Sequence, residues 1–140
     1  MHVTRQRTGD LAGFAASASA FAATLRAGDV VALSGELGAG KTTFVAGVVM
    51  ALQGRDAATS PTFTFWHRYE GEPAINHLDL YRVEGAADLA TLGLEEAFTG
   101  DEIVLVEWPE RAPGLIPPDA IRVGITGAGE APRTIEIVRP

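Results

Sequence analysis

The chain has 140 residues, of which 46% are hydrophobic and 21% charged, and it contains no cysteine. This composition predicts a globular chain of one-domain size and excludes a disordered segment, a disulfide framework and a thiolate metal site. The net charge of −7 argues against a protein that holds nucleic acid by itself, because such proteins usually present a basic face.

The first predicted elements are a short edge strand over residues 2–7 and a helix of about four turns, for which Thr8 and Asp10 offer capping oxygens. Apolar side chains recur on this helix at steps of three and four residues and form one stripe for core packing. They are Leu11, Phe14, Ala15, Ala18, Phe21, Ala22 and Leu25. No stretch approaches the ~18 apolar residues of a membrane span, so we expect a cytoplasmic protein without a membrane contact.

The next stretch matches the phosphate-binding pattern G-x-x-x-x-G-K-[ST]. It reads Gly35-Glu36-Leu37-Gly38-Ala39-Gly40-Lys41-Thr42-Thr43. A β-branched apolar run over residues 30–33 predicts a buried strand before it, and apolar residues at helical spacing predict a helix after it that stops at Gln53-Gly54. Loop N–H groups are expected to point at phosphate oxygens. Lys41 is expected to reach the β and γ phosphates, Thr42 to ligate Mg²⁺ and Thr43 to assist at the α phosphate.

A chance match is the alternative, because the chain has 16 glycines. However, Lys41 is the only lysine in the sequence, and the other cationic side chains apart from histidine are arginines. The chain keeps a compact ammonium at the one position where it must enter a phosphate cradle. Together with the flanking strand and helix, this favours a true nucleotide site.

The middle of the chain is predicted to contain a hairpin. Residues 54–61 are expected to form a loop, and two alternating segments, 62–69 and 74–81, are expected to pair around a turn at 70–73.

The second half of the chain completes an α/β pattern. A helix is predicted over residues 86–98, and a continuous apolar run over 103–106 is typical of the buried centre of a parallel sheet. A proline-rich connection leads to two strands over 120–126 and 134–139, separated by a Gly-Ala-Gly turn. The expected fold is a single P-loop NTPase domain over 1–140, with a mixed, mostly parallel sheet flanked by helices and with β-hairpins.

Two acids are expected beside the phosphate loop, because the carboxyl ends of strands gather there in α/β sheets. Glu107 closes the second buried strand and is predicted to bind Mg²⁺ or to orient the attacking water; the alternative is a solvated charge at a strand end. Asp79 lies between Leu78 and Leu80 and therefore points to the opposite face of its strand. If that face meets the loop, Asp79 belongs to the Mg²⁺ site, and otherwise it is a surface charge.

Other polar and aromatic residues leave two interpretations open. The turn Ser60-Pro61-Thr62-Phe63 presents two hydroxyls that either fold over the γ-phosphate, as switch loops do, or serve ordinary turn chemistry. His77 is either a base or a structural residue, and Trp108 is either core or an exposed contact. Arg82 and Arg111 are candidates for charge stabilisation or partner pairing.

Two other P-loop classes fit less well. Asn76-His77-Leu78-Asp79 only weakly resembles the guanine motif N-K-x-D, and no D-x-x-G follows the loop, which argues against a GTPase. A small-molecule kinase needs an arginine-bearing lid, and the sequence shows no arginine-rich insertion. A nucleotide-dependent binding switch, in which hydrolysis is incidental, remains an alternative.

Four blocks of the sequence together resemble the TsaE (YjeE) family of bacterial tRNA threonylcarbamoyladenosine biosynthesis ATPases. The blocks are Leu37-Gly38-Ala39-Gly40-Lys41-Thr42-Thr43-Phe44, Ser60-Pro61-Thr62-Phe63, His77-Leu78-Asp79-Leu80-Tyr81-Arg82 and Val106-Glu107-Trp108-Pro109-Glu110. Leu92-Gly93-Leu94-Glu95-Glu96 also matches the family's helix. The phosphate loop alone is unspecific, whereas the other blocks in this order are highly specific.

This resemblance implies an ATPase that binds ATP with Mg²⁺, hydrolyses it slowly and supports turnover of the TsaB–TsaD transferase without transferring the group itself. The tRNA would be reached only through these partners. Carried over by residue, the resemblance places Lys41 on phosphate and Thr42 and Glu107 in the Mg²⁺ site. It places Asp79 and Thr62 at the same centre, with Trp108 beside it. The start of the first helix is expected near the adenine, and nothing is carried over onto residues 112–140.

Overall fold

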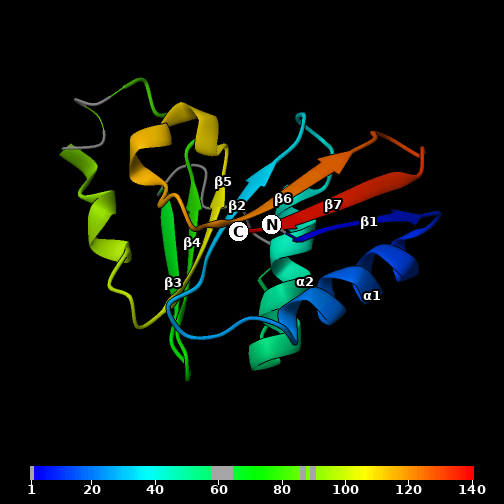
Figure 1. The fold of residues 1–140 in the computed structure, drawn as a ribbon, viewed down its shortest axis with the longest axis horizontal. Helices are drawn as coiled ribbons and strands as arrows, with labels where there is room; N and C mark the ends of the chain where they lie inside the picture. Colours follow the sequence, from blue (N-terminus) through cyan, green and yellow to red (C-terminus); the bar gives the residue numbers. More distant parts are fainter. Residues whose placement is uncertain (1, 58–64, 86–87, 89–90) are drawn as a thin grey trace.

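The computed structural model describes residues 2–57, 65–85, 88 and 91–140. Within these residues, seven strands form one sheet in the order β1-β7-β6-β2-β5-β4-β3 (Figure 1). In chain order they are β1 (His2–Thr8), β2 (Val30–Ser34), β3 (Trp66–Tyr69), β4 (Ile75–Asp79), β5 (Ile103–Glu107), β6 (Ile121–Thr126) and β7 (Arg133–Arg139).

The centre of the sheet is parallel and its margins are antiparallel. Strands β6, β2, β5 and β4 pair in parallel, while β7 pairs antiparallel with both β6 and β1, and β3 pairs antiparallel with β4. Because two reversals restore the direction, β1 also points the same way as the four central strands. The expected mixed, mostly parallel α/β sheet is therefore confirmed, as is the hairpin formed by β3 and β4.

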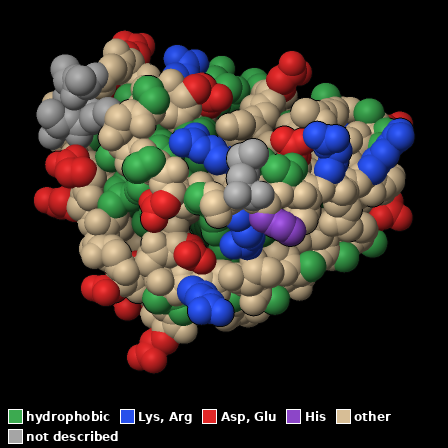
Figure 2. All heavy atoms as spheres, viewed as in Figure 1, with side chains coloured by type: hydrophobic (Ala, Val, Ile, Leu, Met, Phe, Trp, Pro, Cys, Tyr) green, Lys and Arg blue, Asp and Glu red, His purple; other side chains and the backbone are tan. Residues whose placement is uncertain are grey.

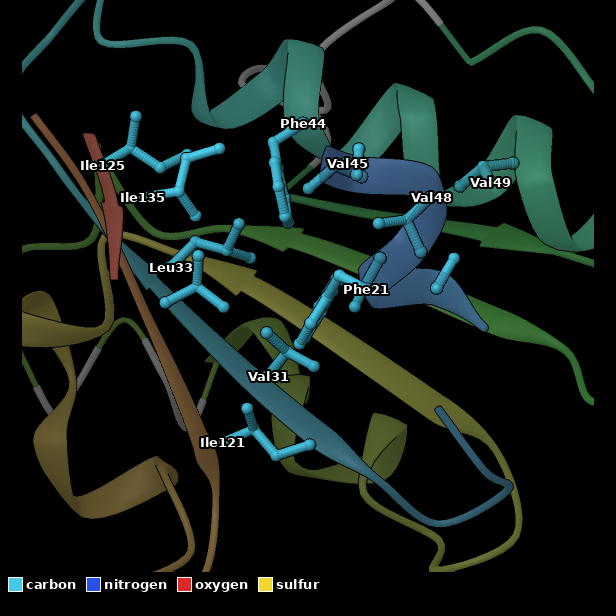
Figure 3. Packing of buried hydrophobic residues seen from close by; sticks show 14 of the residues in the cluster. Phe21, Val31, Leu33, Phe44, Val45, Val48, Val49, Ile121, Ile125 and Ile135 are labelled. Carbon is cyan, nitrogen blue, oxygen red and sulfur yellow. The ribbon is translucent and has the colours of Figure 1, made fainter. Parts of the chain in front are cut away.

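Helices α1 (Leu11–Ala22) and α2 (Lys41–Gln53) lie together on one face of the sheet (Figure 1). Figure 3 shows the rings of Phe21 and Phe44 in the same cluster as Val31 and Leu33 of β2. The two helices approach closely at Gly47, where an added Cβ would lie 2.8 Å from the Cβ of Ala18. In the described part of the chain, no helix is long and apolar enough to cross a bilayer.

The opposite face of the sheet is covered by irregular segments and short 3-10 helices. These are η1 (Leu94–Ala97), η2 (Pro109–Arg111) and η3 (Pro113–Leu115). The continuous apolar run of β5 is explained by this arrangement, because Ile103 and Leu105 face the α-helices while Val104 and Val106 face the second layer. The same alternation turns Glu107, the next residue on the first of these faces, toward α2.

The structure corrects three predicted boundaries. The helix expected over residues 86–98 does not continue to its end, because Gly93 has φ +66° and the following residues form η1. Of the strand expected over 62–69, residues 62–64 lie outside the described residues, and Phe65 is not part of the strand, because its φ of +63° breaks a β ladder; the described strand begins at Trp66. The helix predicted to reach Leu25 ends at Ala22. The predicted switch residues Ser60 and Thr62 lie outside the described residues.

Candidate functional site

The phosphate-loop sequence connects β2 to α2 at the carboxyl end of the parallel strands. Two of its glycines are required by geometry. A Cβ at Gly35 would lie 2.6 Å from the carbonyl oxygen of Ile125, and Gly40 caps α2 with φ +109°, a left-handed conformation that glycine adopts without strain. Gly40 also accepts the first helical hydrogen bond from Phe44 N, at 2.8 Å. The helix therefore starts directly at the loop, with its free N–H groups and positive dipole end facing the site.

Lys41 folds back over this loop and is only 4% exposed. Its ammonium donates hydrogen bonds to the carbonyl oxygens of Gly35 and Glu36, the latter at 3.0 Å, and lies 4.1 Å from the ring centroid of Trp108. Burial lowers the pKa of Lys41, and the nearby carboxylates of Glu107, Glu110 and Asp79 oppose this shift. An anionic ligand in the cleft would favour the charged ammonium further, because an opposite charge stabilises it.

The two predicted acids meet beside Lys41. Asp79 and Glu107 are partners across the β4–β5 pair, and they are only 4% and 2% exposed. Leu78 and Leu80, which flank Asp79, lie in the apolar layer on the other side of the sheet. The prediction that Asp79 would point to the face opposite to theirs is thus confirmed, and that face meets the phosphate loop, because Asp79 lines the same cleft as Gly38 and Thr42.

Glu107 contacts the residue that follows Lys41. The hydroxyl of Thr42 lies 3.0 Å from both carboxylate oxygens of Glu107. Asp79 Oδ1 accepts a hydrogen bond from Tyr81 N at 3.0 Å, which fixes its carboxylate at the end of β4. Hydroxyl and carboxylate oxygens are the ligands that Mg²⁺ prefers, so this donor set fits that ion.

These groups line a cleft of about 430 Å³. The lining residues are Leu37, Gly38, Gly40, Lys41, Thr42, Thr43, Asp79, Tyr81, Glu107 and Trp108. Within the described ranges, no cluster of three or more histidine, cysteine, aspartate or glutamate side chains could hold a metal ion. The cleft offers two carboxylates, of Asp79 and Glu107, and the Thr42 hydroxyl, so a Mg²⁺ bound here would take its remaining oxygen ligands from a nucleotide and from water, as is usual for that ion.

Trp108 forms part of the cleft wall and is half-buried, so it is both packed and accessible. It has φ +59°, directly after the end of β5, and its ring lies 4.8 Å from that of Tyr81. Arg111 continues this stack, with its guanidinium 5.5 Å from the Tyr81 ring. Arg82, the other candidate arginine, lines neither this cleft nor the cavity described next.

A second cavity, of about 420 Å³, lies on the other side of the loop and shares Gly38, Gly40 and Thr43 with the cleft. The start of α1 forms one wall through Leu11 and Phe14. Its remaining lining residues are Thr8, Gly9, Asp10, Ala39, Gly129, Glu130, Ala131 and Arg133. The beginning of the chain and the turn between β6 and β7 thus line the same cavity.

Arg133 is a residue of this cavity that the sequence did not identify. Its Nε donates to the carbonyl oxygen of Ala39 at 2.8 Å, its Nη1 to Ala131 at 2.6 Å and its Nη2 to Gly129 at 3.1 Å. One guanidinium therefore ties the β6–β7 turn to the phosphate loop. The sequence shows only an arginine that follows the Gly-Ala-Gly turn. Its contact with the phosphate loop could not be predicted, because Ala39 lies 94 residues earlier in the chain.

Comparison with known proteins gives a consistent result. The family model described as threonylcarbamoyl adenosine biosynthesis protein TsaE matches residues 8–135. Curated relatives named tRNA threonylcarbamoyladenosine biosynthesis protein TsaE include those of Haemophilus influenzae, 36% identical over 80 residues (56% of this chain, 50% of the relative), and Bacillus subtilis, 39% identical over 77 residues (54% and 48%). The relative from Nostoc sp. is 44% identical over 83 residues (56% and 50%). The chain spans about half the length of these curated relatives.

A solved structure of Bacillus subtilis YdiB has a similar fold. It superposes with a TM-score of 0.79 at 33% sequence identity, over 99% of this chain and 86% of that chain. The likeness therefore includes residues 112–140, onto which no sequence motif extended.

Proposed function

The chain belongs to the TsaE family of threonylcarbamoyl adenosine biosynthesis proteins, and from this premise we propose that it is a Mg²⁺-dependent ATPase that serves tRNA threonylcarbamoyladenosine biosynthesis. In this proposal it is an accessory subunit whose ATP cycle sustains turnover of a TsaB–TsaD transferase, and it acts in the cytoplasm. The observation that carries the ATPase proposal is the meeting of the Lys41 ammonium with the Thr42–Glu107 pair in one cleft at the start of α2.

The proposed roles follow from these contacts. Loop N–H groups and Lys41 hold the β and γ phosphates, exchanging the carbonyl contacts of the ammonium for phosphate oxygens. Thr42, Glu107 and Asp79 would hold Mg²⁺, which supplies charge neutralisation at the phosphates when bound. Glu107 is proposed to orient the attacking water and accept its proton as the bond between the γ-phosphorus and the ADP oxygen breaks. Asp79 is the alternative for this role.

We propose that the second cavity holds the nucleoside. Its lining shares Gly38 and Gly40 with the cleft. One bound ligand can therefore extend over these two residues and occupy both spaces. Leu11 and Phe14 give it an apolar wall against which the flat face of a base can pack. This fits the expectation that the start of the first helix lies near the adenine.

The acidic net charge supports a protein that leaves tRNA to its partners. On the face drawn in Figure 2, the described acidic and basic side chains are interspersed rather than gathered into one basic surface. A protein that bound tRNA directly through this face would need a continuous basic surface to neutralise phosphates.

Phosphate release from ATP by the purified chain tests the proposed activity. We expect release that requires Mg²⁺ and stops when EDTA is added, and that supports repeated tRNA modification when TsaB and TsaD are present. Absence of hydrolysis both alone and with these partners would contradict the ATPase proposal. Phosphate recovered on a small-molecule acceptor would instead indicate a kinase. Full multiple-turnover modification by a variant that binds ATP without hydrolysing it would indicate a binding switch.

Replacing Arg133 with methionine is expected to weaken ATP binding about tenfold, or ~1.4 kcal/mol, with little change in kcat. The substitution removes all three donors that hold the β6–β7 turn against the loop while keeping an apolar stem. Titration with a fluorescent ATP analogue measures this affinity. Arg139→Met, on the same strand but directed to Thr24 and Phe21, is the matched control. An unchanged affinity in Arg133→Met would show that the turn has no part in nucleotide binding.

A further inference from the structure

The proposed hydrolysis leaves one buried titratable side chain without a role, the imidazole of His77. This residue is fully buried on β4, and its Nε2 lies 2.5 Å from Oε2 of Glu107. Its backbone is paired with that of Leu105 on β5, two residues before Glu107. Because side chains alternate along a strand, His77 and Glu107 point to the same face of the sheet and meet there.

The surroundings of His77 specify how it bonds. An ionised Glu107 carboxylate could only accept, so this contact would require the proton of His77 on Nε2. Among the described residues, Nδ1 is buried and has no hydrogen-bond partner. Among the described groups, His77 therefore bonds through Nε2 alone, to Glu107.

The two neighbours of Glu107 have different effects on its carboxylate. The Thr42 hydroxyl is equally distant from Oε1 and Oε2, so it does not select one orientation of the group. His77 contacts only Oε2. The β4–β5 pairing fixes the backbone of His77, so the position of its imidazole does not depend on a bound nucleotide. The imidazole therefore fixes Oε2, and among the described residues the only hydrogen bond to Oε1 comes from Thr42.

We propose that His77 is a positioning residue, which orients the Glu107 carboxylate so that Oε1 is presented to the water that attacks ATP. This inference rests on the proposed ATPase function. It assigns to His77 an effect on the chemical step and not on nucleotide binding, because the imidazole does not line the cleft.

Two substitutions at His77 separate this role from ordinary packing. His77→Leu keeps a similar volume without a donor, and we expect kcat for ATP hydrolysis to fall between about 10- and 100-fold, the effect of a misplaced catalytic group. Affinity for a non-hydrolysable ATP analogue should change less than about threefold, because the phosphate contacts remain. His77→Gln, whose amide N–H reaches about as far as Nε2, should recover most of kcat.

A matched control is available on the neighbouring strand. His67 lies opposite His77 in the β3–β4 pair but is only half-buried, and it lines neither the cleft nor the second cavity. His67→Leu removes the same side chain from the same sheet and should leave kcat unchanged. Thermal unfolding of all variants shows whether a loss of kcat accompanies a loss of folded protein.

Long-range ¹⁵N–¹H spectra of the wild type give a readout that does not depend on activity. They should show the His77 proton on Nε2, and a proton on Nδ1 alone would overturn the proposal even if His77→Leu failed to fold. If the wild type hydrolyses ATP and His77→Leu has the same kcat, the role proposed for His77 is wrong, while the proposed ATPase function stands. Equal losses of kcat and affinity without recovery in His77→Gln would also overturn it and show a packing role. A wild type that does not hydrolyse ATP would refute the proposed function itself.

Discussion

Lys41→Ala is expected to lower the affinity for ATP by about 10²–10³-fold and to abolish measurable hydrolysis. Among the described residues that line the cleft, Lys41 carries the one cationic group, and each charge-assisted hydrogen bond to a phosphate contributes about 1.5–3 kcal/mol. Two such bonds at the lower end of this range total about 3–4 kcal/mol, which corresponds to the expected loss of affinity at ~1.4 kcal/mol per tenfold change. Titration of a fluorescent ATP analogue and a phosphate-release assay measure the two effects.

Two further variants show whether the loss is specific to this ammonium. Lys41→Arg keeps the charge but replaces the compact group with a planar fork, and we expect it to bind ATP almost as poorly as the alanine variant. Arg122→Ala removes a positive charge from an exposed position on β6 and should bind ATP normally. Retained ATP turnover in Lys41→Ala would contradict the role that we assign to the phosphate loop.

Glu107→Gln is expected to reduce kcat by about 10²–10⁴-fold, the usual contribution of a positioned general base, while ATP affinity changes less than about tenfold. Glutamine keeps the volume of the side chain and an oxygen that can accept from Thr42. It loses the negative charge that attracts a proton from water. Single-turnover hydrolysis and equilibrium binding separate the chemical step from affinity.

Two other acids provide the comparison for Glu107. Glu95→Gln changes an exposed acid in η1 that lines neither the cleft nor the second cavity, and it should behave as the wild type. Asp79→Asn tests the alternative, because a larger loss of kcat there would transfer the water-positioning role to Asp79. Equal losses of binding and hydrolysis in Glu107→Gln would make Glu107 a structural residue.

The parts of this site that could be predicted from the sequence are those set by local rules. The strand, loop and helix around Lys41 follow from a glycine pattern between two apolar runs, and α2 ends at the expected Gln53-Gly54. The position of Glu107 beside the loop was predicted from its place at the end of a buried strand. Asp79 was placed by alternation between two leucines, a rule with a period of two that needs no knowledge of the neighbouring strand.

The parts that could not be predicted depend on contacts between distant segments. The bond from His77 to Glu107 joins residues 30 positions apart, and only the parallel pairing of β4 with β5 brings them together. Arg133 belongs to a turn without a motif, and its role at the loop depends on the place of β6 beside β2. The early end of the 86–98 helix follows from one glycine with positive φ, which helical periodicity does not reveal.

The pairing of Asp79 with Glu107 on adjacent strands also bears on how faithfully the chain folds. If β4 slipped by one residue against β5, every side chain on it would change faces. Leu78 and Leu80 would then occupy the cleft in which we propose that ATP binds, and Asp79 would be forced into an apolar layer, where a lone carboxylate is strongly destabilising. A molecule with this shifted pairing would thus be unstable, so the two acids to which we assign roles in hydrolysis would also favour the correct register of β4 and β5.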